Sequence, residues 1–475
     1  MSFVTRRKSI DSVTTHEAHH RLKATLSWPH LVALGVGGIV GTGIYTLVGV
    51  GAGLAGPGVI LSFAIAGAVC ACAALAYAEM STMMPAAGGA YTYSYVVLGE
   101  LLAWIVGCAL IMEYTVVCSA VSVGWSAHAA EFLRSTGVGA PQALLSGPLA
   151  GGLVNLPAVL ICLLVAGLLI LGTRESATVN VVLVIIKVAA LVLFVAVAAP
   201  AFNASHFEPF APFGISRVTP EGVKIGIIPA ASLIFFAFYG FDAISTAAEE
   251  TRRPGRDLTI GILGSMVLCT LIYMAVAAAA IGATPVPAFA ASEAPLVFVL
   301  NSLNHPLVAK LVAGAAVLAL PTVIMVFMYG QSRIFFVMAR DGLLPMSLAR
   351  VSARTGTPVL MTAVTGVFAA AIAGFLPLKD IAELANAGTL VAFIAVAVCM
   401  MVLRLRSPDL PRPFRTPLWW LVGPLAVAGC VYLFVSLPRL THIWFLGVTF
   451  AGLVIYLLFG RVSSRLAGNI SESPR

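Results

Sequence analysis

Charged residues are scarce in this sequence. Only 10% of its 475 residues are Asp, Glu, Lys or Arg, whereas 60% are hydrophobic, and the mean hydropathy is +1.02. A soluble protein typically has about 25% charged residues. The charges collect in short clusters between apolar stretches of about 20 residues, the length of a bilayer-spanning helix. The composition therefore excludes a soluble globular protein and predicts an all-α, polytopic membrane protein.

Patterns of metal-binding, disulfide or catalytic residues are also lacking. The eight cysteines all fall inside apolar stretches, without the spacing of a disulfide or metal site. HEAHH at 16–20 matches a zinc-protease pattern, but it lies in a short polar tail with no packed cleft or third ligand. GAGLAG at 51–56 matches a dinucleotide fingerprint that works only in a soluble βαβ unit. We therefore expect no metal, no cofactor and no enzyme activity.

Twelve apolar stretches are candidate membrane spans. They cover 29–56, 58–84, 98–127, 155–172, 176–200, 226–249, 258–282, 306–341, 358–376, 380–405, 417–435 and 440–460. When they are threaded alternately through a membrane, 20 of the 27 Lys and Arg fall on the side of the N-terminal tail and six on the other, with Lys187 inside a span. The positive-inside rule then predicts that both termini are cytoplasmic. The net charge of +8 thus reflects topology rather than nucleic-acid binding.

Two spans carry helix-weakening sequence at their middle. The first reads GVGGIVGTGIY over 35–45, with five glycines, each of which costs about 1 kcal/mol relative to alanine in a helix. The sixth reads SLIFFAFYGFDAIST over 232–246, with Asp242 at membrane depth, where an acidic residue is expensive and indicates function. Unwound backbone is tolerated in a bilayer only where it lines protein or a watery cavity. The alternative for the glycines is close helix packing, as in the face Gly37-x-x-x-Gly41.

The two interrupted spans are predicted to run in opposite directions, because alternate threading starts the first inside and the sixth outside. Paired interrupted helices in inverted repeats indicate the central site of a transporter. The pattern predicts five-helix repeats over 28–200 and 201–405. A cytoplasmic tail over 1–27 precedes them, and two further helices and a tail follow over 406–475.

Several segments carry a family resemblance. They are GVGGIVGTGIY, YAEMSTMMPAAGGAYTYSY (77–95), FFAFYGFDAISTAAEETRRPGRD (235–257), GQSRIFFVMARDGLLP (330–345) and NAGTL (386–390). In these segments the sequence resembles the amino acid–polyamine–organocation superfamily, and within it the bacterial members of the cationic amino acid transporter group. The resemblance implies a LeuT-type fold of about 12 helices, a 5+5 inverted repeat with two extra helices, and alternating access. It is specific for the family and not for a substrate.

Unwinding at Gly41 to Gly43 would divide the first span into two half-helices that face a cavity. The N–H groups and positive dipole end of the outer half suit a carboxylate, and carbonyl groups of both broken spans suit an ammonium. In family members the aromatic residue that matches Phe236 closes over the substrate; the alternative for Phe236 is plain helix packing. The predicted substrate-binding residues are Ile39, Gly41, Thr42, Gly43, Phe236, Ala237, Tyr239, Gly240 and Asp242.

Two further charges lie at membrane depth, Lys187 in the fifth span and Glu113 in the third. A lysine there must be paired, neutral or facing water, and burial favours its neutral form, so that it can carry a proton. The lysine of span five in proton-coupled family members matches Lys187, and family members carry a glutamate at Glu113. We expect Lys187 to be the proton-responsive group and Glu113 its electrostatic partner or a site-lining acid. The alternative is a structural pair that ties helices together.

The leading hypothesis is a proton-coupled symporter in the cell membrane that carries an L-amino acid into the cytoplasm. An exchanger of the same fold is the alternative, and a channel would need a polar pore or filter repeat that the spans lack. The expected partners are an amino acid, a proton and the lipid bilayer, with no nucleic acid and no indication of oligomeric state. Cationic substrates would need a spare carboxylate from Asp242 or Glu113, whereas a bulky Leu320 that shortens the pocket favours small neutral ones.

Overall fold

The computed structural model describes residues 6–10, 26–86, 88–135, 137, 141–171, 177–220, 222–248, 251–345, 347–348 and 359–466. The HEAHH sequence at 16–20 and most of the predicted tail over 1–27 lie outside these residues. The described residues form a bundle of helices with one short antiparallel strand pair, β1 (Arg217–Val218) and β2 (Lys224–Ile225). The predicted all-α class is confirmed.

Ten of the twelve predicted spans are uninterrupted helices. They are α5 (Val59–Met83), α7 (Glu100–Ser135), α8 (Leu156–Leu171), α9 (Ala177–Ala198), α12 (Pro254–Ala283), α15 (Pro306–Arg340), α16 (Val359–Phe375), α17 (Leu378–Arg406), α18 (Trp419–Ser436) and α19 (Arg439–Ile455). In the described part of the chain, nine helical stretches are long and apolar enough to cross a membrane, and three apolar helices are shorter. The remaining two predicted spans, 29–56 and 226–249, are both interrupted.

The first span consists of α2 (Trp28–Ile39), α3 (Thr42–Tyr45) and α4 (Leu47–Ala55). Val40 and Gly41 separate α2 from α3 with extended backbone, ψ being 95° at Val40 and −152° at Gly41. The break therefore falls at Val40–Gly41, slightly before the predicted Gly41 to Gly43, and Gly43 lies inside the short α3. A 3₁₀ turn, η2 (Gly56–Gly58), then leads into α5.

The sixth span consists of α10 (Ile227–Ile234), the 3₁₀ turn η7 (Phe235–Phe238) and α11 (Phe241–Thr246). Tyr239 is extended and Gly240 has φ +112°, a conformation that glycine adopts without steric cost. A Cβ at Gly240 would also lie 2.5 Å from the carbonyl carbon of Gly38. This position requires glycine both for its backbone angle and for the close approach of the first span.

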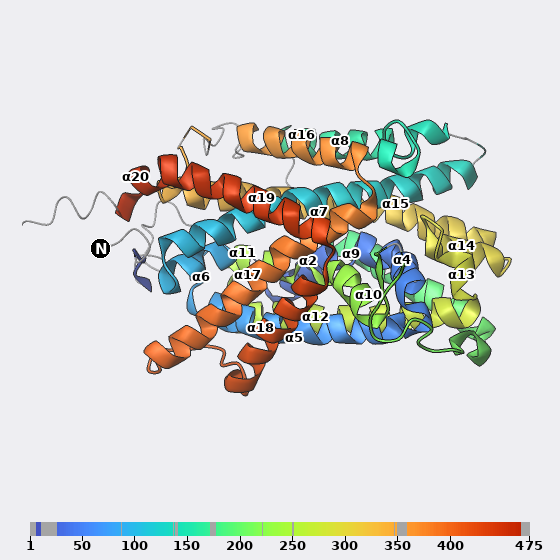
Figure 1. Cartoon of the computed structure of the whole chain (residues 1–475), viewed down its shortest axis with the longest axis horizontal. Helices are drawn as coiled ribbons and strands as arrows, with labels where there is room; N and C mark the ends of the chain where they lie inside the picture. The colour runs from blue at the N-terminus through green and yellow to red at the C-terminus, as the bar shows by residue number, and fades with distance from the viewer. Residues whose placement is uncertain are drawn as a thin grey trace, which may run out of the picture.

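The two interrupted spans are antiparallel and cross at their breaks. Gly38 contacts Gly240, while Gly43, further along the first span, contacts Ala237, which precedes Gly240. Around this crossing, α8 and α16 lie along one edge of the bundle and α5 and α12 along the opposite edge, with α2, α4, α10 and α11 between them (Figure 1). The crossing places both breaks in the middle of the molecule.

Both described ends of the chain lie at one end of the bundle, here called the terminal end; the opposite end is the distal end. The Arg6 guanidinium donates to the carbonyl of Arg461, which begins α20 (Arg461–Ser463). The terminal end also carries α6 (Gly89–Val97) and the π-helical turn η9 (Tyr456–Gly460). The distal end carries α13 (Val286–Phe289), α14 (Pro295–Ser302) and the 3₁₀ turns η3 (Gln142–Leu144), η4 (Pro148–Ala150), η5 (Ala199–Ala201) and η6 (Ala204–Phe207).

Candidate functional site

A small cavity, here called the central cavity, lies where the two breaks face α7 and α15. Its volume is about 10 Å³, roughly the space of one water molecule. Of the predicted substrate-binding residues, Ile39, Gly41, Thr42, Gly43, Phe236 and Tyr239 line it, and Ala237, Gly240 and Asp242 do not. Gly38, Val117, Val121, Val323 and Phe327 complete the wall and were not predicted. The structure is closed around this cavity, so a substrate enters only after side chains move.

The first break presents backbone donors to the cavity. The N–H groups of Gly41, Thr42 and Gly43 donate no backbone hydrogen bond to a described residue, as is usual at the start of a helix. The Gly41 carbonyl points the other way and accepts the N–H groups of Ile44 and Tyr45 at 3.2 and 3.3 Å. Gly41, Thr42 and Gly43 thus line the cavity with N–H groups that bond to no backbone carbonyl of the described residues, and their binding of a carboxylate stays a prediction.

The glycines of the first span serve two different purposes. A Cβ at Gly43 would lie 2.4 Å from the Ala237 Cα, and one at Gly38 would lie 3.2 Å from the Gly240 Cα. A Cβ at Gly41 would make only ordinary contacts, the nearest with Val323 at 3.5 Å. Close packing thus accounts for Gly38 and Gly43, and Gly41 alone among these three has room on its cavity side.

Thr42 anchors α3 to α7. Its hydroxyl donates to the Val121 carbonyl at 3.5 Å, and its side chain fills the space beside Gly124, where a Cβ would come within 2.3 Å. The predicted role of this hydroxyl as a substrate ligand therefore competes with a contact to the protein itself.

Carbonyl groups freed by the first break are bound by other helices. The Ile39 carbonyl accepts the Tyr273 hydroxyl at 2.6 Å, and the Gly37 carbonyl accepts the Lys187 ammonium at 2.9 Å. Each carbonyl oxygen has a second lone pair, so a substrate ammonium that bound the Ile39 carbonyl oxygen would share it with the Tyr273 hydroxyl.

Lys187 is fully buried between three helices. Besides Gly37 at the end of α2, its Nζ donates to the Thr322 hydroxyl of α15 at 2.9 Å. The Thr322 hydroxyl in turn donates to the Ala319 carbonyl at 2.7 Å. The lysine of α9 thereby links the broken first span to α15, and its protonation state bears directly on that link.

Glu113 does not share a hydrogen bond with Lys187. Neither carboxylate oxygen of this fully buried residue accepts a hydrogen bond from a described residue. Its Cβ lies beside Gly388 of α17, where a Cβ would come within 3.1 Å of it. The two side chains therefore share no direct hydrogen bond, and the expected role of Glu113 as an electrostatic partner of Lys187 or a site-lining acid stays a prediction.

Asp242 stabilises the second break instead of lining the cavity. Its carboxylate accepts the Tyr114 hydroxyl of α7 at 2.8 Å and the Gly240 N–H at 3.1 Å. A carboxylate at the start of a helix also interacts favourably with the helix dipole. Its buried charge is thus used to hold α11 against α7.

Asn386, in the NAGTL segment of α17, binds the backbone of the second break. Its amide donates to the Ser232 and Leu233 carbonyls at 2.6 and 3.2 Å, and its oxygen accepts the Tyr239 hydroxyl. These carbonyls lie at the end of α10, where helical partners are lost. This role was not predicted, although a polar amide at membrane depth is a signal that could have indicated it.

Pro321 frees a carbonyl that α7 uses. A proline inside a helix lacks the N–H that would bond the carbonyl four residues earlier, here that of Val317. The Trp125 indole of α7 donates to this carbonyl at 2.9 Å. This hydrogen bond fixes α15 against α7 beside the cavity. The wall residues that α15 contributes are Val323 and Phe327, and Leu320, which was expected to shorten the pocket, is not among them.

A small cavity between two antiparallel helix breaks, deep in a bundle of apolar spans, is the arrangement typical of a membrane transporter. The family model described as amino acid permease matches residues 26–465. The chain belongs to this amino acid permease family of the amino acid–polyamine–organocation superfamily, and it is a multi-pass amino acid transporter rather than an enzyme.

Relatives with assigned functions cover nearly the whole chain. The branched-chain amino acid permease of Bacillus subtilis is 42% identical over 98% of this chain and 99% of its own length. The methylthioribose transporter of the same organism is 37% identical over 98% of this chain and 100% of its own length. The vacuolar cationic amino acid transporter 2 of Arabidopsis thaliana is 38% identical over 85% of this chain and 63% of its own length.

Proposed function

We propose that this protein is a proton-coupled symporter for L-amino acids with small or branched aliphatic side chains, which it carries into the cytoplasm. The observation that carries this proposal is the two-sided wall of the central cavity. Backbone N–H groups of Gly41, Thr42 and Gly43 form one side. The other side is apolar and consists of Val117, Val121, Phe236, Val323 and Phe327.

The cavity wall favours a neutral side chain. None of the residues that line it carries a charged side chain, and Asp242 is already bound by Tyr114 and Gly240. A lysine or arginine side chain would bury its charge there without a partner, at a cost of several kcal/mol. The relative named for branched-chain amino acids supports the same class of substrate.

Proton coupling is proposed to act through Lys187. The charged ammonium has three donors, and two of them hold Gly37 at the first break and Thr322 of α15. Loss of the proton weakens charge-assisted hydrogen bonds by about half and so loosens α2 from α15. Proton release would then accompany movement of the half-helix that lines the cavity.

The proposal includes a topology and an internal symmetry. Both termini would lie in the cytoplasm, so that the distal end faces outward across the cell membrane. The two repeats would cover residues 28–200 and 201–405, with the tail over 1–27 before them and residues 406–475 after them. The antiparallel crossing of the two breaks supports this division.

Uptake by proteoliposomes tests the substrate and the driving ion. We expect an inward proton gradient to drive accumulation of L-leucine and L-alanine, with little accumulation of L-arginine or methylthioribose. Preferred uptake of L-arginine would overturn the substrate class, and preferred uptake of methylthioribose would reject an amino acid substrate. Accumulation driven by Na⁺ and indifferent to pH would reject proton coupling, and counterflow without net accumulation would favour an exchanger.

Substitution of Lys187 tests the coupling residue. Lys187→Met should abolish the pH dependence of L-leucine uptake while L-leucine binding stays measurable, because the lysine does not line the cavity. Lys310→Met, at an exposed position of α15, is the matched control and should keep the pH profile of the unmodified protein. An unchanged pH profile in Lys187→Met would remove this residue from the coupling mechanism.

A further inference from the structure

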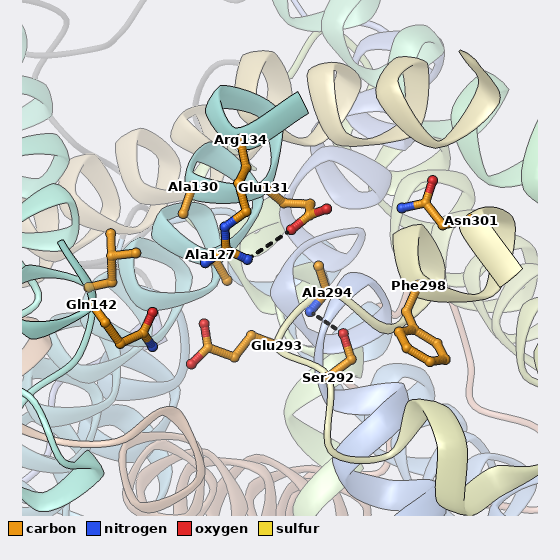
Figure 2. A pocket seen from close by; sticks show the side chains of 11 residues that line it. Ala127, Ala130, Glu131, Arg134, Gln142, Ser292, Glu293, Ala294, Phe298 and Asn301 are labelled. Carbon is orange, nitrogen blue, oxygen red and sulfur yellow. Dashed lines mark hydrogen bonds and ion pairs between the residues drawn. The ribbon is translucent and has the colours of Figure 1, made fainter. Parts of the chain in front are cut away.

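A second and much larger pocket, here called the distal pocket, opens at the distal end. Its volume is about 390 Å³, within the range of small-molecule sites. It lies between the last turns of α7, the turn η3 and the connection from α13 to α14 (Figure 2). On α7, Ala127 of this pocket follows Val121 of the central cavity by six residues, a rise of about 9 Å.

The distal pocket contains both signs of charge. Arg134 and Glu131 of α7 form an ion pair at 3.4 Å, and Glu293 approaches from the opposite wall. The Gln142 amide, the Glu293 carboxylate and the Arg134 guanidinium turn toward the same space in Figure 2. One cation and two carboxylates leave a net charge of −1. The remaining wall is mostly apolar, with Ala130, Leu145 and Phe298.

Arg134 and Glu293 retain capacity for a ligand. A guanidinium has five N–H donors, and only the contact with Glu131 is an ion pair among the described residues. Although part of Glu293 is exposed, the pocket walls remove enough water to raise the pKa of its carboxyl, and the Arg134 guanidinium opposes this rise. A ligand cation beside Glu293 would restore part of the lost solvation.

We propose that the distal pocket is a second, peripheral binding site for a zwitterionic amino acid. Arg134 and the Gln142 amide bind its carboxylate, Glu293 binds its ammonium, and the apolar wall with Phe298 receives an aliphatic side chain. This inference rests on the proposed amino acid substrate and adds a capture site at the outward-facing end.

The wall that carries Glu293 is in contact with the broken first span. A Cβ at Gly49 of α4 would lie 3.0 Å from the Pro295 side chain and 3.3 Å from the Phe289 carbonyl oxygen. One at Gly53 would lie 3.4 Å from the Ala290 Cβ. The opposite wall, with Arg134, belongs to α7. A zwitterion that bridges Arg134 and Glu293 would therefore join α7 to the segment that rests on α4.

Equilibrium binding of radiolabelled L-leucine to purified protein tests the proposal. The unmodified protein should bind two molecules per chain. Gly41→Val, whose added methyl groups enter the central cavity beside Val323, should retain one weaker, saturable site. Leucinamide, which lacks the carboxylate, and 4-methylpentanoate, which lacks the ammonium, should each compete poorly for that site.

Matched substitutions identify the pocket. In the Gly41→Val protein, Arg134→Gln and Glu293→Gln should each weaken L-leucine binding about tenfold, as expected for loss of a partly exposed charge-assisted hydrogen bond. Lys310→Gln and Glu208→Gln, at exposed positions outside the pocket, should leave binding unchanged. In the otherwise unmodified chain, Arg134→Gln should weaken the second of the two L-leucine sites by the same factor, a result that does not depend on folding of the Gly41→Val protein.

Two results would overturn the proposal, and they differ in meaning. One L-leucine per chain in the unmodified protein, with accumulation in proteoliposomes intact, rejects the distal site and leaves the proposed function standing. Absence of both binding and accumulation for every amino acid tested rejects the proposed function together with the site. Equal binding in the Arg134→Gln and unmodified proteins likewise rejects the assigned residues.

Discussion

At the scale of single residues, two neighbouring glycines of the first break have separable roles. Gly43→Ala places a methyl group 2.4 Å from the Ala237 Cα, so the two backbones must separate at a cost of about 1–3 kcal/mol. We expect a lower melting temperature and at least tenfold slower L-leucine uptake. Fluorescence-detected thermal unfolding and proteoliposome uptake measure the two effects.

Gly41→Ala provides the comparison for Gly43→Ala. Its methyl group makes only ordinary contacts, the nearest with Val323 at 3.5 Å, so the melting temperature should stay within about 2 °C of that of the unmodified protein. Because the methyl group occupies cavity space, uptake of L-leucine should fall more than uptake of L-alanine. Equal effects of the two substitutions on stability would contradict the separation of packing from substrate contact.

Asp242 offers a second test at this scale, because it was expected to bind substrate and instead holds Tyr114 and Gly240. Asp242→Asn and Tyr114→Phe both remove part of this contact, so each should destabilise the protein by about 1–3 kcal/mol. Neither should change the ratio of L-leucine to L-arginine uptake. If Asp242→Asn alone changed the ratio of L-leucine to L-arginine uptake, in either direction, Asp242 would have to contact the substrate.

At the scale of helices, Asn386 of α17 holds the end of α10 at the second break. Asn386→Ala leaves the Ser232 and Leu233 carbonyls without their side-chain donor, at a cost of about 2–3 kcal/mol. We expect a lower melting temperature and faster hydrogen exchange over α10 and η7. Tyr239→Phe, which loses one hydroxyl contact and keeps both carbonyl bonds, should have a clearly smaller effect, and equal effects would contradict this role.

The helices themselves could be predicted well from the sequence, and their contacts could not. Hydropathy and charge clusters indicate all twelve spans, and Gly41 and Gly240 mark both breaks, because apolar length and glycine act locally. Val117, Val121, Val323 and Phe327 of the cavity wall resemble every other apolar residue of their spans. The partners of Lys187, Asp242 and Asn386 depend on helix rotation and register, which local sequence does not determine.

At the scale of the whole molecule, a layer of packed aromatic side chains separates the central cavity from the terminal end. Tyr77 packs edge to face against Phe241 and Phe393 there, and these two rings are tilted against each other, with ring centroids 5.0–5.6 Å apart in the three pairs. The buried Tyr77 hydroxyl has no hydrogen-bond partner among the described residues, which is costly in a permanent core. If the protein works by alternating access, as the family resemblance implies, this hydroxyl would be hydrated whenever the terminal end opens.

The outermost part of that closure is a contact between the chain's N-terminal segment and the helix ends. Asp341, just after α15, accepts the Lys8 ammonium at 2.5 Å and the Tyr91 hydroxyl of α6 at 2.8 Å. Asp341→Asn keeps an acceptor for Tyr91 and removes the ion pair, which should favour opening by about 1–3 kcal/mol, or roughly 5- to 150-fold in population. Hydrogen exchange should become faster over α6 and α2 and stay unchanged over α14, and the L-leucine accumulation ratio should fall. Asp409→Asn, at an exposed position of the same end, should change neither; unaltered exchange in Asp341→Asn would mean that this ion pair does not hold the terminal end closed.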